Sequence, residues 1–246
     1  MKRNEKRLFA ILMTIACLFA IAPTANAMHI MEGYLPPVFC VAWGVICLPF
    51  LFFGFKKLSK SVEENRKSIT MIAMSGAFIF VISSLKIPSV TGSCSHMTGT
   101  GLGAILFGPA AVSVLGLIVL IFQAILLAHG GLSSIGANTF SMAIAGPLVS
   151  WLIYKALKNT KVNKKVTIFL AAAIGDLFTY CVTSFQLALA YPSAQSGVAA
   201  SAVKFLGIFA TTQLPLAIIE GILTVIVMIA LESYAGSELK AIKYAE

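Results

Sequence analysis

The stretch that decides the fold is residues 99–128, GTGLGAILFGPAAVSVLGLIVLIFQAILLA. It carries no charged side chain and is longer than the about 20 residues that a helix needs to cross a bilayer. Glycines crowd its first part, and Gly108-Pro109 interrupts it. Proline lacks a backbone N–H and favours a helix start or a kink. We therefore expect a short element ending near residue 108, followed by a full helix over about 109–128.

The rest of the chain shares this apolar character. Hydrophobic residues make up 59% of the 246 residues and charged residues only 11%, which places the chain in the membrane class. Five further apolar segments are long enough to cross a bilayer, at about 37–55, 69–87, 138–156, 166–190 and 204–231. The sequence therefore predicts an all-α polytopic membrane protein.

The N-terminus has the pattern of a secretory signal peptide. Basic residues precede an apolar run, and the small-residue sequence Ala25-Asn26-Ala27 follows as a cleavage site. The alternative is an uncleaved first transmembrane helix, but the run is shorter than the about 20 residues needed to span. We expect residues 1–27 to be removed, so that residues 28–246 form the mature domain and Met28 becomes its first residue.

The formal net charge of +9 could indicate nucleic-acid binding, but the basic residues lie in short clusters beside apolar segments. Such clusters mark the cytoplasmic side of membrane proteins. The three clusters are Lys56, Lys57, Lys60, Arg66 and Lys67; then Lys155, Lys158, Lys161, Lys164 and Lys165; then Lys240 and Lys243. We expect all three to be cytoplasmic, together with the tail at 232–246, and the chain to lie in the cell membrane.

These clusters also test the number of crossings. With the mature N-terminus outside, a single crossing by residues 101–128 would place the second cluster outside, against the positive-inside rule. Two passes, or a re-entrant loop at 98–108 plus a helix, restore the agreement. We therefore predict about seven transmembrane helices, the third short or re-entrant. The segment 28–36 and the loops with His96 and His129 then lie on the extracytoplasmic face.

The expected mature N-terminus has the chemistry of a metal chelate. The α-amine of Met28, the backbone nitrogen of His29 and its imidazole Nδ1 can close fused five- and six-membered rings around one ion. One equatorial position stays open, and His96 is the candidate for it. Four nitrogens in a plane suit Ni(II), Cu(II) or low-spin Co(II), whereas Zn²⁺ prefers a tetrahedron and Ca²⁺ or Mg²⁺ prefer oxygen.

Four other residues are weaker candidates around such a site. His129 could fix the geometry of the ligands or cap a helix C-terminus. Glu32 could orient the chelate or balance its charge. Asn138 could bond backbone groups of its loop or act as the N-cap of segment 138–156. Cys94, two residues before His96, could be a soft ligand or an ordinary loop residue.

Two acidic residues lie inside apolar segments. Asp176 and Glu220 are costly in lipid, so we expect them to face the bundle interior or a partner, in hydrogen-bonded packing or in a proton relay. The sequence contains no H-E-x-x-H, G-x-S-x-G or G-x-x-x-x-G-K-[ST] motif. It therefore favours a non-enzyme that does not bind ATP through a phosphate loop, and a metal sensor or a structural membrane protein stays an alternative.

The N-terminal and central motifs resemble one known family. Met28-His29-Ile30-Met31-Glu32-Gly33-Tyr34-Leu35-Pro36 after a signal peptide is similar to the mature start of the substrate-binding membrane components (S-components) of energy-coupling-factor cobalt and nickel transporters, the CbiM/NikM family. Further similar motifs follow in the same order: residues 93–103, Leu106-Phe107-Gly108-Pro109, His129-Gly130-Gly131-Leu132 and Gly136-Ala137-Asn138. Together they run through most of residues 28–231.

This resemblance implies a fold and a function. It implies the α-helical S-component fold, with the metal held by the Met28 amine, the His29 backbone and side chain, and the His96 imidazole. Met31 after Ile30 looks like the cobalt branch, so Co²⁺ is the expected substrate and Ni²⁺ the alternative, with no organic cofactor. The captured cobalt would supply cobalamin biosynthesis.

The resemblance also implies partners. They are a CbiQ-like transmembrane coupling subunit, CbiO-like subunits that hydrolyse ATP, and a small CbiN-like accessory membrane subunit. Small residues permit the close helix approach that such docking requires, and they equally permit internal packing. The glycines with this double interpretation are Gly76, Gly116, Gly146 and Gly175.

Overall fold

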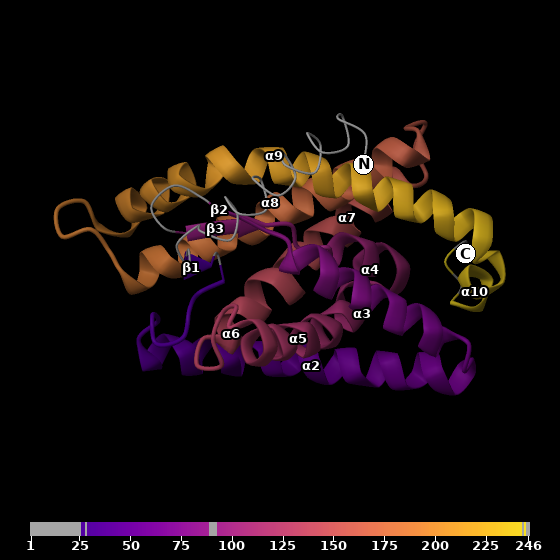
Figure 1. Ribbon diagram of the computed structural model, residues 1–246, viewed down its shortest axis with the longest axis horizontal. Coiled ribbons are helices and arrows are strands. Elements are labelled where there is room, and N and C mark those ends of the chain that lie inside the picture. Colours follow the sequence, from indigo (N-terminus) through magenta and orange to yellow (C-terminus); the bar gives the residue numbers. More distant parts are fainter. Residues whose placement is uncertain (1–25, 28, 89–92, 243, 245–246) are drawn as a thin grey trace, which may run out of the picture.

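The computed structural model describes residues 26–27, 29–88, 93–242 and 244, and this part of the chain is almost entirely helical. The helices are α2 (Pro37–Glu64), α3 (Ser68–Ser84), α4 (Thr100–Phe107), α5 (Pro109–Leu127), α6 (Ile135–Asn138), the π-helix η2 (Thr139–Ala145), α7 (Gly146–Leu157), α8 (Lys164–Ala190), α9 (Gly197–Tyr234) and α10 (Gly236–Ala241). Figure 1 shows α2 along one side of the bundle and α9 along the other, with the shorter helices between them.

Five of the helical stretches are long and apolar enough to cross a membrane. They are α2, α5, the continuous run Ile135–Leu157 made of α6, η2 and α7, then α8 and α9. This confirms the expected all-helical, multi-pass membrane fold. The count of seven crossings stays a prediction, because α3 has 17 residues and α4 only 8, fewer than the about 20 that span a bilayer.

The expected break at Gly108-Pro109 is present. Helix α4 ends at Phe107 and α5 begins at Pro109 as its first residue, with Gly108 between them at φ 81°. All residues of α4 are buried, and at 1.5 Å per residue this helix is only about 12 Å long. A Cβ added to Gly108 would lie 2.7 Å from Lys57 Nζ, so α4 ends beside the first basic cluster.

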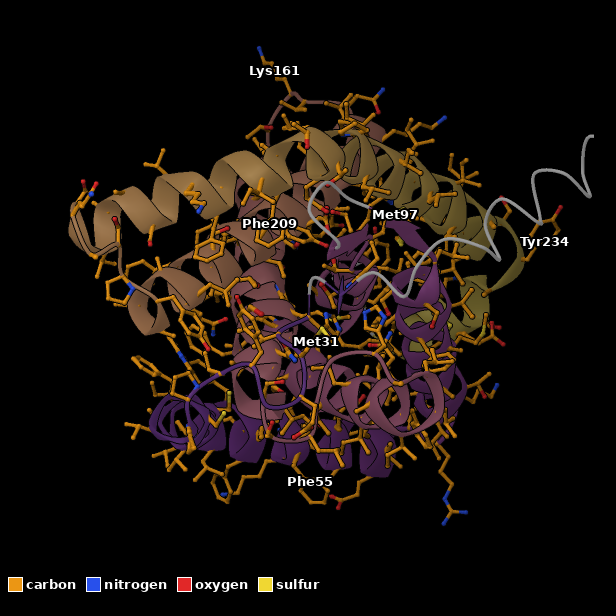
Figure 2. The ribbon with its side chains drawn as sticks, turned by 60° about the vertical axis from the view of Figure 1, so that its left-hand side comes forward. Met31, Phe55, Met97, Lys161, Phe209 and Tyr234 are labelled. Carbon is orange, nitrogen blue, oxygen red and sulfur yellow. The ribbon has the colours of Figure 1, made fainter. Side chains whose placement is uncertain are left out.

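The outside of the bundle is apolar, as a lipid-facing surface requires. Large exposed hydrophobic side chains follow α2 from Val38 to Phe55 and α9 from Val203 to Tyr234. Figure 2 shows Phe55, Lys161 and Tyr234 at the periphery, whereas Met31 and Met97 lie toward the middle of the view.

A small sheet lies in the left-hand half of the view in Figure 1, with the strand order β1-β3-β2. Its strands are β1 (Asn26–Ala27), β2 (Lys86–Pro88) and β3 (Ser93–His96). Strand β3 pairs with β1 in parallel and with β2 antiparallel, with Lys86 opposite His96. The sheet brings the chain around the expected cleavage point next to the strand that ends in His96.

Candidate metal centre

Three histidines that are far apart in the sequence meet inside the protein. His29 lies in the N-terminal segment, His96 ends β3, and His129 follows α5, with exposed fractions of 5%, 1% and 0%. Their ring centroids lie 4.6 Å (His29 to His96), 4.6 Å (His29 to His129) and 4.9 Å (His96 to His129) apart. One ring nitrogen from each can be chosen so that all three lie within 4.8 Å of one another.

The hydrogen bonds of His96 indicate which of its nitrogens carries the proton. Its Nδ1 lies 2.8 Å from the backbone oxygen of Met97. A carbonyl only accepts hydrogen bonds, so Nδ1 carries the proton, and in a neutral imidazole Nε2 then has a lone pair. This Nε2 lies 3.1 Å from His29 Nδ1.

The side chains of Ser83 and Gln123 indicate in the same way which nitrogen of His29 carries the proton. Ser83 Oγ donates to the backbone oxygen of Ile79, so it accepts the 2.7 Å bond from Gln123 Nε2. The amide oxygen of Gln123 must then face His29 Nε2, at 3.2 Å, and Nε2 carries the proton. His29 Nδ1 is left with a lone pair that points at the lone pair of His96 Nε2.

Two imidazole lone pairs 3.1 Å apart repel each other unless they share a proton or a cation. Beside them a cavity of about 10 Å³ is lined by the two rings and by hydroxyl side chains of η2 and α8, namely Ser141, Thr179 and Thr183. This volume holds about one water-sized particle. The arrangement can therefore bind one small cation through nitrogen, the ligand type that borderline transition metals prefer.

The N-terminal segment is bound to the protein through the backbone of Ile30. Asn138 accepts a 2.8 Å bond from Ile30 N and donates a 3.0 Å bond to Ile30 O, and Ser134 Oγ donates to the same oxygen. Of the two alternatives for Asn138, the N-cap does not apply, because the helix already begins at Ile135 and the side chain of Asn138 makes no capping bond. The amide is used instead to hold the residue next to His29.

The loop after α5 packs against the N-terminal segment that contains His29 and Glu32. A Cβ on Gly130 would lie 3.2 Å from the His29 side chain, and one on Gly131 would lie 2.4 Å from the Glu32 backbone nitrogen. The exposed carboxylate of Glu32 accepts a bond from the Ser133 backbone N–H at 3.1 Å. Hydrogen bonds from Ser133 lower the pKa of Glu32. Glu32 thus contacts the loop rather than the imidazoles.

His96 is held through its backbone as well. Tyr180 on α8 donates its hydroxyl to the His96 carbonyl, and Gln213 on α9 lies 3.5 Å from the same oxygen. Sequence reasoning missed Tyr180 and Gln213, and it also missed Gln123. The sequence feature that could have indicated these residues is a polar group within an apolar segment, but periodicity does not tell which polar groups converge in space.

The other predicted residues have different outcomes. The structure places His129 against both other imidazoles, while its backbone N–H bonds Gln123 O at the end of α5. Cys94 lies in β3, where its backbone pairs with Ala27 and Pro88, and its role stays a prediction. Met28 lies outside the described residues. Asp176 and Glu220 are 1% and 0% exposed, as expected of residues that face the bundle interior.

Known structures share this fold. A crystal structure of a truncated transition metal transporter is 29% identical, matches with a TM-score of 0.73, and covers 84% of this chain and 99% of that one. A second crystal structure of a transition metal transporter is 30% identical, with a TM-score of 0.72, and covers 83% and 92%. The fold, with imidazoles buried between its helices, is that of a transition-metal transporter.

Sequence relatives narrow this class. The family model of the cobalt uptake substrate-specific transmembrane region, CbiM, matches residues 29–237. The cobalt transport protein CbiM of Lachnoclostridium phytofermentans is 69% identical over 97% of this chain and 96% of its own. That of Chlorobium limicola is 61% identical over 92% and 89%. The chain belongs to the CbiM family and is a transmembrane component of cobalt uptake.

Proposed function

We propose that this chain is the substrate-capture subunit of an ATP-driven energy-coupling-factor importer for Co²⁺. The observation that carries the proposal is the pair of imidazole nitrogens, His29 Nδ1 and His96 Nε2, whose lone pairs face each other across 3.1 Å inside the protein. Such a pair favours a transition-metal cation over Ca²⁺ or Mg²⁺, which prefer oxygen. The relatives named for cobalt transport point to cobalt.

The full ligand set in this proposal has four nitrogens. His29 supplies its backbone nitrogen and Nδ1, His96 supplies Nε2, and signal cleavage after Ala27 supplies the α-amine of Met28 as the fourth. The two hydrogen bonds between Asn138 and the Ile30 backbone support this placement, because they fix the backbone immediately after His29. His129 packs against both ligand rings and orients them.

The remaining parts of the importer lie on other chains in this proposal. A CbiQ-like coupling subunit, CbiO-like ATP-hydrolysing subunits and a CbiN-like accessory subunit complete it, and the cobalt supplies cobalamin biosynthesis. The mature N-terminus and residues 28–36 face outward, and the tail at 232–246 faces the cytoplasm. The lack of a phosphate-loop motif supports ATP hydrolysis by partners.

Two alternative functions can be distinguished from this proposal by experiment. Ni²⁺ accepts the same planar set of nitrogens, so the same role for nickel is the first alternative. A membrane metal sensor without transport is the second. Only a transporter accumulates the metal inside cells in a manner that depends on ATP and on the partner subunits.

The proposal is tested on purified protein that begins at Met28, incubated with equal Co²⁺ and Ni²⁺, beside a form whose Met28 α-amine is acetylated. We expect about one metal per chain in the first form and none in the second, because acetylation converts the α-amine into an amide. His29→Ala and His96→Ala should abolish binding, while His129→Ala should only weaken it. Equal binding by both forms would remove the α-amine from the ligand set, and preferential nickel binding would change the substrate.

A further inference from the structure

A buried carboxylate holds the loop that follows His96. Glu220 on α9 is 0% exposed, and both of its oxygens accept hydrogen bonds from this loop. Thr98 N donates to Oε2 at 2.6 Å, Thr98 Oγ1 donates to Oε1 at 3.0 Å, and Gly99 N donates to Oε1 at 3.0 Å. Two backbone amides and one hydroxyl of the loop therefore converge on a single side chain.

The chain path links these contacts to the imidazole. Only Met97 separates His96 from Thr98, and Gly99 leads at φ 68° into the wholly buried helix α4. On the other side of Met97, Tyr180 and Gln213 hold the carbonyl of His96. The loop is thus fastened before and after Met97, and the ring of His96 has little freedom to move.

The pattern of donors explains why a carboxylate is used. Buried N–H groups require acceptors, and charge-assisted hydrogen bonds are the stronger ones. Oε1 and Oε2 each face a backbone N–H, so an amide side chain would turn one of its own N–H groups against a donor. Neither of the two ion pairs among the described residues includes Glu220, so pairing with a cation does not account for it there.

We propose that Glu220 is a positioning residue for the metal site, acting through the amides of Thr98 and Gly99 to keep His96 Nε2 within reach of His29 Nδ1. This inference rests on the proposed ligand role of His96. It gives a function to an acidic residue that is otherwise costly inside a membrane protein.

The test uses full-length mature protein beginning at Met28, with Co²⁺ as the probe. Glu220→Gln should raise the Kd for Co²⁺ by about 10–100-fold, the usual effect of losing a group that orients a ligand. It should also shift the visible absorption of bound Co(II) at saturation, because the angle of the His96 ring changes. The matched control is Thr224→Val, one turn further along α9 and 0% exposed, whose hydroxyl has no hydrogen-bond partner among the described side chains. It should bind like the unaltered protein.

A double-mutant cycle separates positioning from general stability. In a Tyr180→Phe background, where the His96 carbonyl has lost the hydroxyl that bonds it, Glu220→Gln should cause a smaller loss of Co²⁺ affinity than it does in the unaltered protein, since the two act through one ligand. If Glu220→Gln does not fold, Thr98→Val decides the question. It keeps both amide contacts and loses the bond that the hydroxyl donates to Glu220 and the one that it accepts from Thr100. Loss of the bond to Glu220 alone should lower the affinity by about 2–12-fold.

The outcomes distinguish the proposed function from the positioning role. If the unaltered protein binds no Co²⁺, the proposed function fails. If the unaltered protein binds Co²⁺ and His96→Ala abolishes binding, but Glu220→Gln and Thr98→Val both keep full affinity and an unchanged spectrum, only the positioning role of Glu220 is overturned. Additive losses in the double-mutant cycle would overturn it as well.

Discussion

Gln123 illustrates how one polar side chain within an apolar helix controls the chemistry next to it. It is 0% exposed in α5, and it connects Ser83 to His29 Nε2. Because its orientation is fixed at the serine, the Nδ1 lone pair of His29 faces His96 Nε2. A partner of this kind is the usual means by which proteins set the tautomer of a ligand histidine.

We therefore expect Gln123→Leu to weaken Co²⁺ binding by about 10–100-fold while the protein remains folded. The measurement is the Kd for Co²⁺ in detergent, with the melting temperature as a check. Gln186→Leu is the matched control, because Gln186 is also 0% exposed and bonds only the Ala137 backbone oxygen among the contacts described. Equal weakening in both variants would attribute the effect to packing.

The sequence predicted the residues of the histidine cluster better than the residues that support it. The spacing of Met28 and His29 carries chemistry of its own, so His29 and His96 could be singled out from the sequence alone. The roles of Asn138 and Gln123 depend on contacts between residues 108 and 94 positions apart. No local pattern encodes such contacts, so the sequence leaves Asn138 open between backbone bonds and a helix cap and does not single out Gln123.

Among the helices, small residues serve internal packing. A Cβ on Gly116 in α5 would lie 2.4 Å from the Cβ of Ala143 in η2, and one on Gly146 would lie 3.0 Å from the Gly175 backbone oxygen. Gly76 differs, since a Cβ there would make only an ordinary contact of 3.9 Å. The first three glycines therefore allow close approach within the bundle, and of the four only Gly76 leaves room for another role.

Gly116→Ala should lower stability by about 1–3 kcal/mol, because the Cβ of Ala143 cannot rotate away and the helices must separate. Gly76→Ala should change it by less than about 0.5 kcal/mol, as expected for an ordinary site. Thermal unfolding in one detergent, followed by circular dichroism, compares the two. Equal melting temperatures would show that η2 adjusts at no cost.

Helix boundaries were predictable only where the sequence contains helix-breaking residues. The division between α4 and α5 followed from Gly108-Pro109. Helix α2 instead continues to Glu64, beyond the expected end near 55, because hydropathy reports where the bilayer ends and not where the helix ends. The π-helical turn η2 was not predicted, since its wider spacing leaves no clear signature in a uniformly apolar run.

For the whole molecule, lysines of two basic clusters lie close together. Lys57 of the first basic cluster lines the same cavity of about 340 Å³ as Lys155 and Lys158 of the second. Clusters almost 100 residues apart in the sequence thus lie at one end of the bundle. Both clusters can therefore face the same side of the membrane, and that this side is the cytoplasm stays a prediction.

Cysteine labelling tests this topology in a variant without native cysteines. In intact cells, we expect Gln195→Cys to react with a membrane-impermeant maleimide, and Arg66→Cys and Lys161→Cys to react only after permeabilisation. The last two lie on the same side only if residues 67–160 cross an even number of times, which requires the α4 region to count as a crossing. Labelling of Arg66→Cys and Lys161→Cys from opposite sides would exclude the short third crossing.

The contacts around His96 join residues that are far apart in the sequence, so the site is completed late in the synthesis of the chain. All three histidines lie within the first 129 residues, yet Thr98 is held by Glu220, 122 positions later. During synthesis the ribosome releases His29, His96 and His129 long before α9 enters the membrane. A truncated chain that ends after α8 would therefore contain every imidazole and still lack the support that orders them. Because Glu220 is proposed to position His96, we expect such a truncated chain to bind Co²⁺ more weakly than the complete chain, so the site would reach its full affinity only after α9 is inserted.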